Sequence, residues 1–110
     1  MSYRCHEMEE GEVLNRDKYR YPLYKATLYG DKIACAKFSK RLSCAVKQLP
    51  LRVQFSFEYN TQKAIEAGVT KSPTLVLEGD IFLEGLVQAE EITEAFQNIK
   101  DRWHLQKPTT

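Results

Sequence analysis

A proline at the mouth of a hairpin constrains this chain more than any other feature. Ser72-Pro73 comes just before two short apolar runs, Leu75 to Leu77 and Ile81 to Leu83, which are joined through Gly79-Asp80. Proline has no N–H group, so a sheet tolerates it only at the first residue of a strand or at an edge. Gly-Asp suits the positive backbone angles of a tight turn. The segment predicts a proline turn leading into a β-hairpin, with a cis bond at Ser72-Pro73 because that isomer costs X-Pro little.

The hydrophobic periodicity predicts the other elements. An apolar residue at every second position predicts a half-buried strand over residues 51–58, and a shorter strand is expected over residues 25–29. Apolar residues three and four apart predict a long helix that runs to Pro50 and a last helix behind Glu90 and Glu91. The two helical stripes are Phe38, Leu42, Ala45, Val46, Leu49 and Ile92, Ala95, Phe96, Ile99. A short helix, capped by Asn60 or Thr61 and closed by Gly68, completes the order β-α-β-α-β-β-α.

The 110 residues suffice for one domain with a substantial core. We expect an N-terminal extension over residues 1–23, whose order the pattern leaves open, a domain over 24–101 and a C-terminal tail over 102–110. The helix between the first two strands makes a crossover, so those strands should be parallel, whereas the hairpin strands should be antiparallel. His104 and Trp103 are expected to belong to a partly docked tail.

Net charge and hydropathy exclude several classes of function. The 16 basic and 15 acidic residues give a formal net charge of +1, which provides no field for nucleic acid or for an anionic membrane surface. No apolar run is long enough to span a bilayer, and no apolar signal segment is present near Met1. The expectation is a soluble, cytoplasmic protein that binds neither nucleic acid nor membrane.

The three cysteines, Cys5, Cys35 and Cys44, have the spacing of neither a zinc site nor a secreted disulfide framework. Cys5-His6 offers only two potential ligands in the N-terminal extension, which makes a poor metal site. Cys44 lies nine residues beyond Cys35 on the same helix, too far for the two to form a disulfide, and we expect it to have no chemistry. Neither a metal nor a cofactor is predicted.

The order of elements and the segment Gly68-Val69-Thr70-Lys71-Ser72-Pro73-Thr74-Leu75-Val76 resemble the thioredoxin fold around its cis-proline. Tyr29-Gly30 and Ala45-Val46-Lys47-Gln48-Leu49 are similar to segments of the small thioredoxin-like and glutaredoxin-like redox proteins of archaea and bacteria. The resemblance covers about residues 25–100. It implies an α/β fold with a four-stranded mixed sheet flanked by three helices, and a thiol redox site at the start of the long helix.

The redox motif departs from the family's CxxC, since the chain reads Lys32-Ile33-Ala34-Cys35. At about 100° per residue, Cys35 lies within roughly 20° of Leu42 and Val46, on the buried stripe, while Ile33 points nearly the opposite way. This phase favours Cys35 as the buried, resolving cysteine, with Lys32 where the nucleophile would be. In the alternative alignment Cys35 is the nucleophile and Phe38 replaces its partner, which shifts the helix by three residues.

Two functions follow from these alternatives. In the first, a binding or scaffold module keeps a peptide groove at Ile33, Ser72 and Pro73 but has given up dithiol chemistry, and its partner is a protein or peptide. In the second, Cys35 is a reactive single thiol beside the Lys32 cation, and glutathione or a partner thiol resolves its mixed disulfide. Cys35 also has a purely structural interpretation as a small apolar core residue. We favour the binding module.

Overall fold

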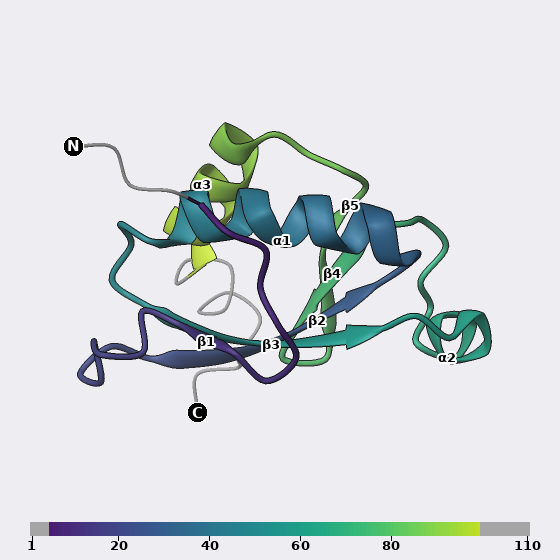
Figure 1. Cartoon of the computed structure of the whole chain (residues 1–110), viewed down its shortest axis with the longest axis horizontal. Helices are drawn as coiled ribbons and strands as arrows, with labels where there is room; N and C mark the ends of the chain where they lie inside the picture. Colours follow the sequence, from purple (N-terminus) through teal and green to yellow (C-terminus); the bar gives the residue numbers. More distant parts are fainter. Residues whose placement is uncertain (1–4, 100–110) are drawn as a thin grey trace, which may run out of the picture.

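The computed structural model describes residues 5–99 as a mixed sheet with helices packed on it. The elements are β1 (Val13–Leu14), β2 (Leu23–Tyr29), α1 (Lys32–Val46), β3 (Arg52–Glu58), α2 (Thr61–Glu66), β4 (Thr74–Leu77), β5 (Asp80–Glu84) and α3 (Ala89–Gln97). In Figure 1, α1 and α3 lie over one face of the sheet, and α2 lies beyond the end of β3. Trp103, His104 and the rest of the predicted tail lie outside the described residues.

The sheet has the strand order β1-β3-β2-β4-β5. β2 and β3 are parallel, with Ala26 opposite Phe55, and β4 and β5 form an antiparallel hairpin, with Leu75 opposite Leu83. Both pairings were predicted from the sequence and are confirmed. The crossover helix α1 explains the parallel pair, because a connection that returns to the same end of the sheet needs a segment of this length.

The sheet gains a fifth strand that the sequence analysis did not predict. β1 comes from the N-terminal extension and pairs antiparallel with β3, where Leu14 lies opposite Val53. A two-residue strand has almost no periodicity to detect, and charged residues surround it. The thioredoxin-like α/β architecture is as predicted, with five strands in place of four.

The hairpin turn is displaced by one residue from the prediction. The positive backbone angles belong to Glu78, at φ 51°, and Gly79, at φ 88°, while Asp80 is already in β5. Glu78 is held there through Lys25 of β2, because the Glu78 N–H donates to the Lys25 carbonyl and the Lys25 N–H donates to the Glu78 carboxylate. Contacts with the neighbouring strand therefore hold a non-glycine residue in a left-handed conformation that is otherwise costly.

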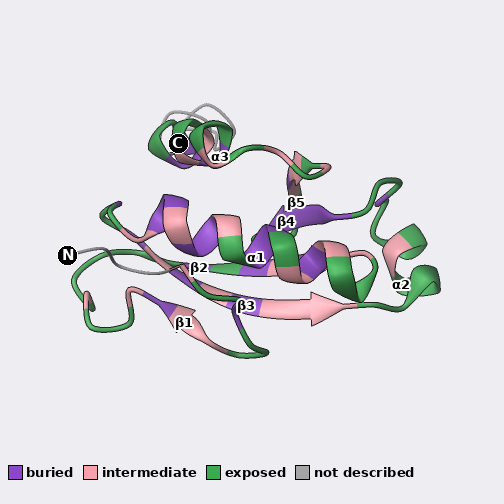
Figure 2. Cartoon of the chain, turned by 45° about the horizontal axis from the view of Figure 1, so that its top comes forward, coloured by how far each residue is buried: buried purple, intermediate pink, exposed green. Residues whose placement is uncertain are grey.

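The core lies between the sheet and the helices α1 and α3, and Figure 2 shows buried residues along the inner side of α1. Alternate residues of β2 and β3 face it, and the predicted apolar stripes of α1 and α3 are buried against them. Its largest fully buried side chains include Phe38, Phe55, Phe96, Leu28, Leu42, Leu75, Leu77 and Ile92. Within residues 5–99, no helix is both long and apolar enough to cross a membrane.

The N-terminal strap, residues 5–14, runs from α1 to the edge of the sheet. Met8 is buried in the core, and its N–H donates to the Ser39 hydroxyl at 3.0 Å, while the His6 N–H donates to the Ser43 hydroxyl at 3.1 Å. Ser39 and Ser43 are themselves buried polar residues of α1. The Ser39 hydroxyl also donates to the Ala36 carbonyl of its own helix at 2.9 Å. The two serines therefore act toward the strap as acceptors for its backbone N–H groups, which need partners when buried.

Candidate functional site

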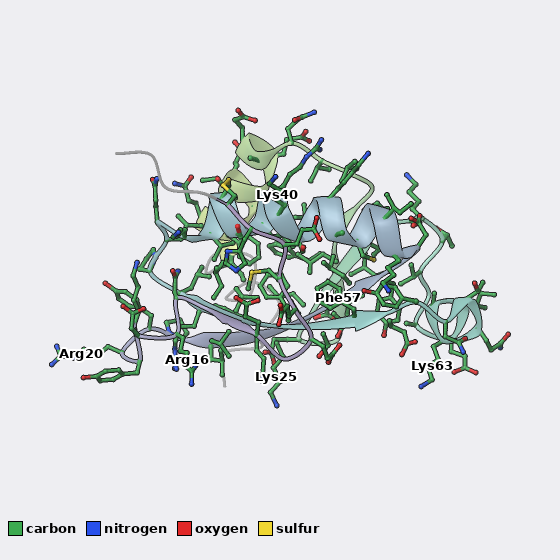
Figure 3. All side chains as sticks on the ribbon, viewed as in Figure 1. Arg16, Arg20, Lys25, Lys40, Phe57 and Lys63 are labelled. Atoms are coloured by element: carbon green, nitrogen blue, oxygen red, sulfur yellow. A yellow bond between two sulfur atoms is a disulfide. The ribbon has the colours of Figure 1, made fainter. Side chains whose placement is uncertain are left out.

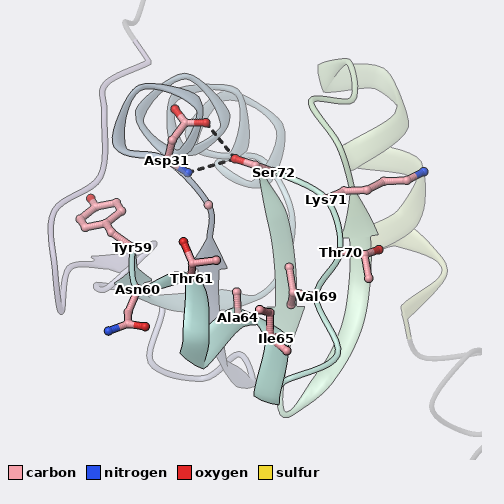
Figure 4. A pocket seen from close by; sticks show the side chains of 11 residues that line it. Asp31, Tyr59, Asn60, Thr61, Ala64, Ile65, Val69, Thr70, Lys71 and Ser72 are labelled. Carbon is pink, nitrogen blue, oxygen red and sulfur yellow. Dashed lines mark hydrogen bonds between the residues drawn. The ribbon is translucent and has the colours of Figure 1, made fainter.

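A groove of about 370 Å³ lies where the chain leaves β2 and β3 and approaches β4. Figure 4 shows the side chains that line it, which come from three segments: the start of α1, the β3–α2 connection with α2, and the loop before β4. The lining residues are Gly30, Asp31, Tyr59, Asn60, Thr61, Ala64, Ile65, Val69, Thr70, Lys71 and Ser72. The predicted groove residue Ser72 thus lines a real depression, whereas Pro73 is fully buried beneath it.

Asp31 occupies the start of α1. It is the N-cap residue, and its Oδ1 accepts a hydrogen bond from the Ala34 N–H at 2.8 Å. Its carboxylate also accepts from the Ser72 hydroxyl at 2.9 Å, so the helix start is tied to the loop before β4, as the dashed lines in Figure 4 show. The Ala34 N–H, and then the Ser72 hydroxyl, lower the pKa of Asp31 below the ordinary value. The Asp31 carboxylate therefore already interacts with the positive end of the helix dipole.

Gly30 allows this close approach of the two segments. Its φ is 142°, and a Cβ placed there would collide with the Ser72 hydroxyl and come within 3.2 Å of the Pro73 Cα. Only glycine combines that backbone angle with the absence of a side chain. The Ser72–Pro73 peptide bond next to it is cis.

Cys35 is a free, fully buried thiol. It lies on the same face of α1 as Phe38 and Leu42, which are also fully buried, as the helical phase predicted. Burial, and then the negative charge of Asp31, raise the pKa of the Cys35 thiol from 9.0 to about 11. Both effects disfavour the thiolate, which is the reactive form of cysteine.

Lys32 and Ile33 are both exposed at the first turn of α1. Ile33 is 72% exposed, which is unusual for a large aliphatic side chain, and Tyr59 and Ile65 at the groove are 48% and 61% exposed. Exposed apolar groups around a depression are a common feature of surfaces that bind a partner. Lys32, which the sequence analysis aligned with the nucleophile of the family, has no thiol and cannot exchange with a disulfide.

The backbone of Ser72 is open to a partner within the described structure. Among residues 5–99, no backbone–backbone hydrogen bond outside the helices and strands uses its N–H or C=O, whereas the next carbonyl, that of Pro73, accepts from the Gly85 N–H at 2.7 Å. Ser72 also lies just before β4, whose first residue Thr74 pairs with Tyr29. An extended peptide could therefore pair with the chain at residue 72.

The prediction that Cys44 has no chemistry is wrong. Cys5 and Cys44 form a disulfide, with their Cα atoms 5.1 Å apart. Sequence spacing gave no sign of it because the strap must first pair with β3 and bury Met8 before Cys5 reaches the far half of α1. The available signal was the polar pair Ser39 and Ser43 on the buried side of a predicted helix, which calls for a covering segment.

His6 forms an ion pair with Glu12, at 2.8 Å from Nε2 to the carboxylate, when its ring is protonated. Throughout the described part of the chain, no three His, Cys, Asp or Glu side chains are grouped so as to hold a metal ion.

Sequence reasoning missed Asp31 as a site residue. Its signal was the sequence Gly30-Asp31 directly before the helix, since aspartate is a preferred N-cap residue. This pattern predicts that the Asp31 carboxylate accepts hydrogen bonds from the N–H groups at the start of the helix.

The order and pairing of the strands and helices define a thioredoxin-like fold. The crystal structure of thioredoxin from Aeropyrum pernix is similar to the structure of this chain, with a TM-score of 0.53 and 19% sequence identity over 84% of this chain and 96% of that one. The sequence matches no protein-family model. Comparison with curated proteins also gives no match. The likeness concerns the fold alone.

Proposed function

We propose that this protein is a peptide-binding module of thioredoxin fold that does not use Cys35 for redox chemistry. The observation that carries the proposal is the state of Cys35, which is fully buried and has a pKa raised to about 11. A thiol acts as a nucleophile when it is accessible and its pKa is lowered. Cys35 meets neither condition.

The start of α1 supports the same conclusion. A free helix N-terminus can stabilise a thiolate through its unpaired N–H groups and the helix dipole. Here the Asp31 carboxylate takes the Ala34 N–H, and the negative charge of Asp31 disfavours a second anion nearby. The other two cysteines are joined to each other at a distant part of α1. A mixed disulfide on Cys35 would have no neighbouring thiol to resolve it.

The groove provides the elements of peptide recognition. Tyr59 and Ile65 offer exposed apolar surface in the groove, and the backbone of Ser72 offers a donor and an acceptor at the entrance to β4. The predicted groove residue Ile33 is not among the lining residues, but it is exposed two residues after Asp31, which does line the groove. In this mode of binding, main-chain hydrogen bonds hold an extended peptide and side-chain contacts select it. The Asp31–Ser72 hydrogen bonds and Gly30 fix the spacing of the groove walls. The fitting partner is an extended segment with an apolar side chain for Ile33, and it needs no cysteine.

The test is a selection of displayed random peptides that lack cysteine on the full chain. Affinities of the selected peptides are then compared for the wild type, Ile33→Lys and the control Tyr19→Lys. Both residues are highly exposed, at 72% and 77%, so neither change should disturb folding. We expect Ile33→Lys to weaken binding about tenfold, the equivalent of about 1.4 kcal/mol, and Tyr19→Lys to leave it unchanged.

Two results would overturn the proposal. One is the absence of any peptide whose affinity depends on Ile33. The other is enrichment only when cysteine is allowed in the library, with binding lost in Cys35→Ser, which would favour the single-thiol redox function.

A further inference from the structure

The Cys5–Cys44 disulfide lies at a surface cavity of about 500 Å³, well away from the peptide groove along α1. The cavity is lined by Cys5, Lys37, Lys40, Arg41, Cys44 and Ala89. Both cysteines are partly exposed, so their sulfur atoms are not sealed in the core as Cys35 is. A disulfide exchanges only when an attacking thiolate can reach one of its sulfurs, and this disulfide meets that condition.

Three cations surround the disulfide. Lys37, Lys40 and Arg41 precede Cys44 by seven, four and three residues, which places all of them on one face of α1. Figure 3 shows Lys40 on this helix, far from the exposed Lys25 and Lys63. Arg41 is fixed in position because its guanidinium donates to the carbonyls of Leu86 and Val87 at 3.1 and 2.9 Å. No acidic side chain is among the described residues that line the cavity.

This setting favours thiol–disulfide exchange with an anionic thiol. Positive charge near a cysteine stabilises its thiolate and so makes it a better leaving group. The same charge raises the local concentration of anionic reactants. The cavity also has room for a small molecule beside the sulfurs. We therefore propose that Cys5–Cys44 is a redox-active disulfide that exchanges with a low-molecular-weight thiol carrying carboxylates, which bind at Lys37, Lys40 and Arg41.

The exchange takes two steps and transfers two electrons. The thiolate of the small thiol attacks the Cys5 sulfur, a new S–S bond forms, and the Cys5–Cys44 bond breaks with Cys44 leaving as a thiolate beside Lys40 and Arg41. The thiolate of a second small thiol then attacks the mixed disulfide at the sulfur that came from the first small thiol. Cys5 leaves as a thiolate, and the two cysteine thiolates take protons from solvent. The protein disulfide is reduced, two small thiols are oxidised to their disulfide, and the reverse sequence restores the starting state.

The strap keeps the two thiols close after reduction. The strap has other contacts besides the disulfide, since Met8 is buried, its N–H donates to the Ser39 hydroxyl, and β1 pairs with β3. We expect these contacts to persist after reduction. Cys5 is only three residues from Met8 and therefore stays near Cys44. The bond can re-form without refolding of the chain, which reversible exchange requires. This inference is independent of the peptide groove and of Cys35.

The test uses the full chain and glutathione as the anionic probe thiol. The oxidised protein is incubated with reduced glutathione, thiols are trapped with acid and alkylating agent, and the cysteines are assigned by mass spectrometry. We expect a glutathione adduct on Cys5, then the Cys5 and Cys44 dithiol, and recovery of the disulfide with oxidised glutathione. Reduction rates are also measured with neutral mercaptoethanol and cationic cysteamine.

Charge variants separate a binding role of the cations from a general effect on the disulfide. We expect Lys37→Gln with Lys40→Gln to slow reduction by glutathione severalfold and to slow reduction by mercaptoethanol and cysteamine much less. The leaving Cys44 thiolate is the same for all three reagents, but only glutathione brings carboxylates that bind the two lysines. The matched control Lys25→Gln with Lys63→Gln removes the same charge elsewhere and should change none of the rates. The proposal is wrong if glutathione does not reduce the disulfide in the folded protein. It is also wrong if the two lysine pairs affect the glutathione rate equally.

Discussion

The Ser72 hydroxyl is bonded twice to Asp31, accepting from the Asp31 N–H at 3.0 Å and donating to the Asp31 carboxylate at 2.9 Å. Forty-one residues of chain separate the two, and their contact joins the start of α1 to the loop before β4. The Asp31 carboxylate caps α1 at the same time through the Ala34 N–H. One carboxylate therefore caps the helix N-terminus and ties it to the loop that lines the groove.

The first prediction concerns this carboxylate. Asp31→Ala should destabilise the fold, whereas Asp31→Asn should cost less because asparagine is an equally good N-cap residue. The pKa of Asp31 is lowered by the Ala34 N–H and then by Ser72. The advantage of the wild type over Asp31→Asn should therefore be present above pH 3.8 and be lost as the pH falls through the lowered pKa. Urea unfolding of the three proteins across this range measures it. Equal losses in both variants would contradict the capping role.

The second prediction concerns the close approach at Gly30. Gly68→Ala should cost about 1 kcal/mol, because its φ of 79° is unfavourable for alanine but the space around it is open. Gly30→Ala should cost at least about twice as much, since collision with Ser72 adds roughly 1–3 kcal/mol of overpacking. Thermal or urea unfolding gives both values. Comparable losses of unfolding free energy at the two glycines would mean that Ser72 does not approach Gly30 as closely as the structure shows.

The third prediction uses the raised pKa of Cys35. Below pH 9 the buried thiol is neutral, and Cys35→Ala should cost on the order of 1 kcal/mol of lost packing. Because the folded pKa is about 11 against an ordinary 9.0, the folded protein holds its proton longer than the unfolded chain does. The stability contributed by this group should therefore fall between pH 9 and pH 11, by about 2–3 kcal/mol.

The comparison is best made with Cys5→Ser and Cys44→Ser present in both proteins, so that no disulfide can rearrange. With rising pH, Cys35→Ala should change from the less stable to the more stable protein. A difference in unfolding free energy that stays constant from pH 7 to pH 11 would show that the thiol ionises freely in the folded state.

The fourth prediction concerns the disulfide. The bond closes a loop across a sequence separation of 39 residues, so its reduction should lower the unfolding free energy by about 3–4 kcal/mol, chiefly through the unfolded state. Urea unfolding with and without reductant measures this change. The amide protons of β1 should stay protected in the reduced protein, because β1 pairs with β3 and Met8 is buried nearby in the strap. Loss of that protection would mean that the disulfide, not Met8 and the ladder, holds the strap.

The sequence predicts the fold well where periodicity is strong. The stripe through Phe38, Leu42 and Val46 correctly placed Cys35 in the core, and the alternation through Val53 and Phe55 correctly predicted a strand. The crossover helix before that strand correctly predicted its parallel pairing with β2. Each of these patterns reflects one helix or strand that faces the core, so it can be read from the sequence of that element alone.

The features that were missed depend on contacts between distant segments. β1 and the disulfide depend on the strap lying along α1, where the N–H groups of His6 and Met8 donate to the Ser43 and Ser39 hydroxyls. Neither hydroxyl reveals its partner in the sequence. Asn15 is a similar case, since its side-chain amide donates to the carbonyls of Val46, Leu49 and Leu51 where α1 ends. The groove depends likewise on Asp31 meeting Ser72. Polar contacts of this kind become visible only after the chain is folded.

The most direct test of the account is catalysis by Cys35 itself. In the protein with Cys5→Ser and Cys44→Ser, reduction of a model protein disulfide with dithiothreitol as electron source should be no faster than with dithiothreitol alone. The reason is that Cys35 is buried, is protonated at neutral pH and has no partner thiol. A further Cys35→Ser change should therefore have no effect on the rate. Sustained turnover that disappears on Cys35→Ser would contradict the account and make this protein a single-thiol redox catalyst.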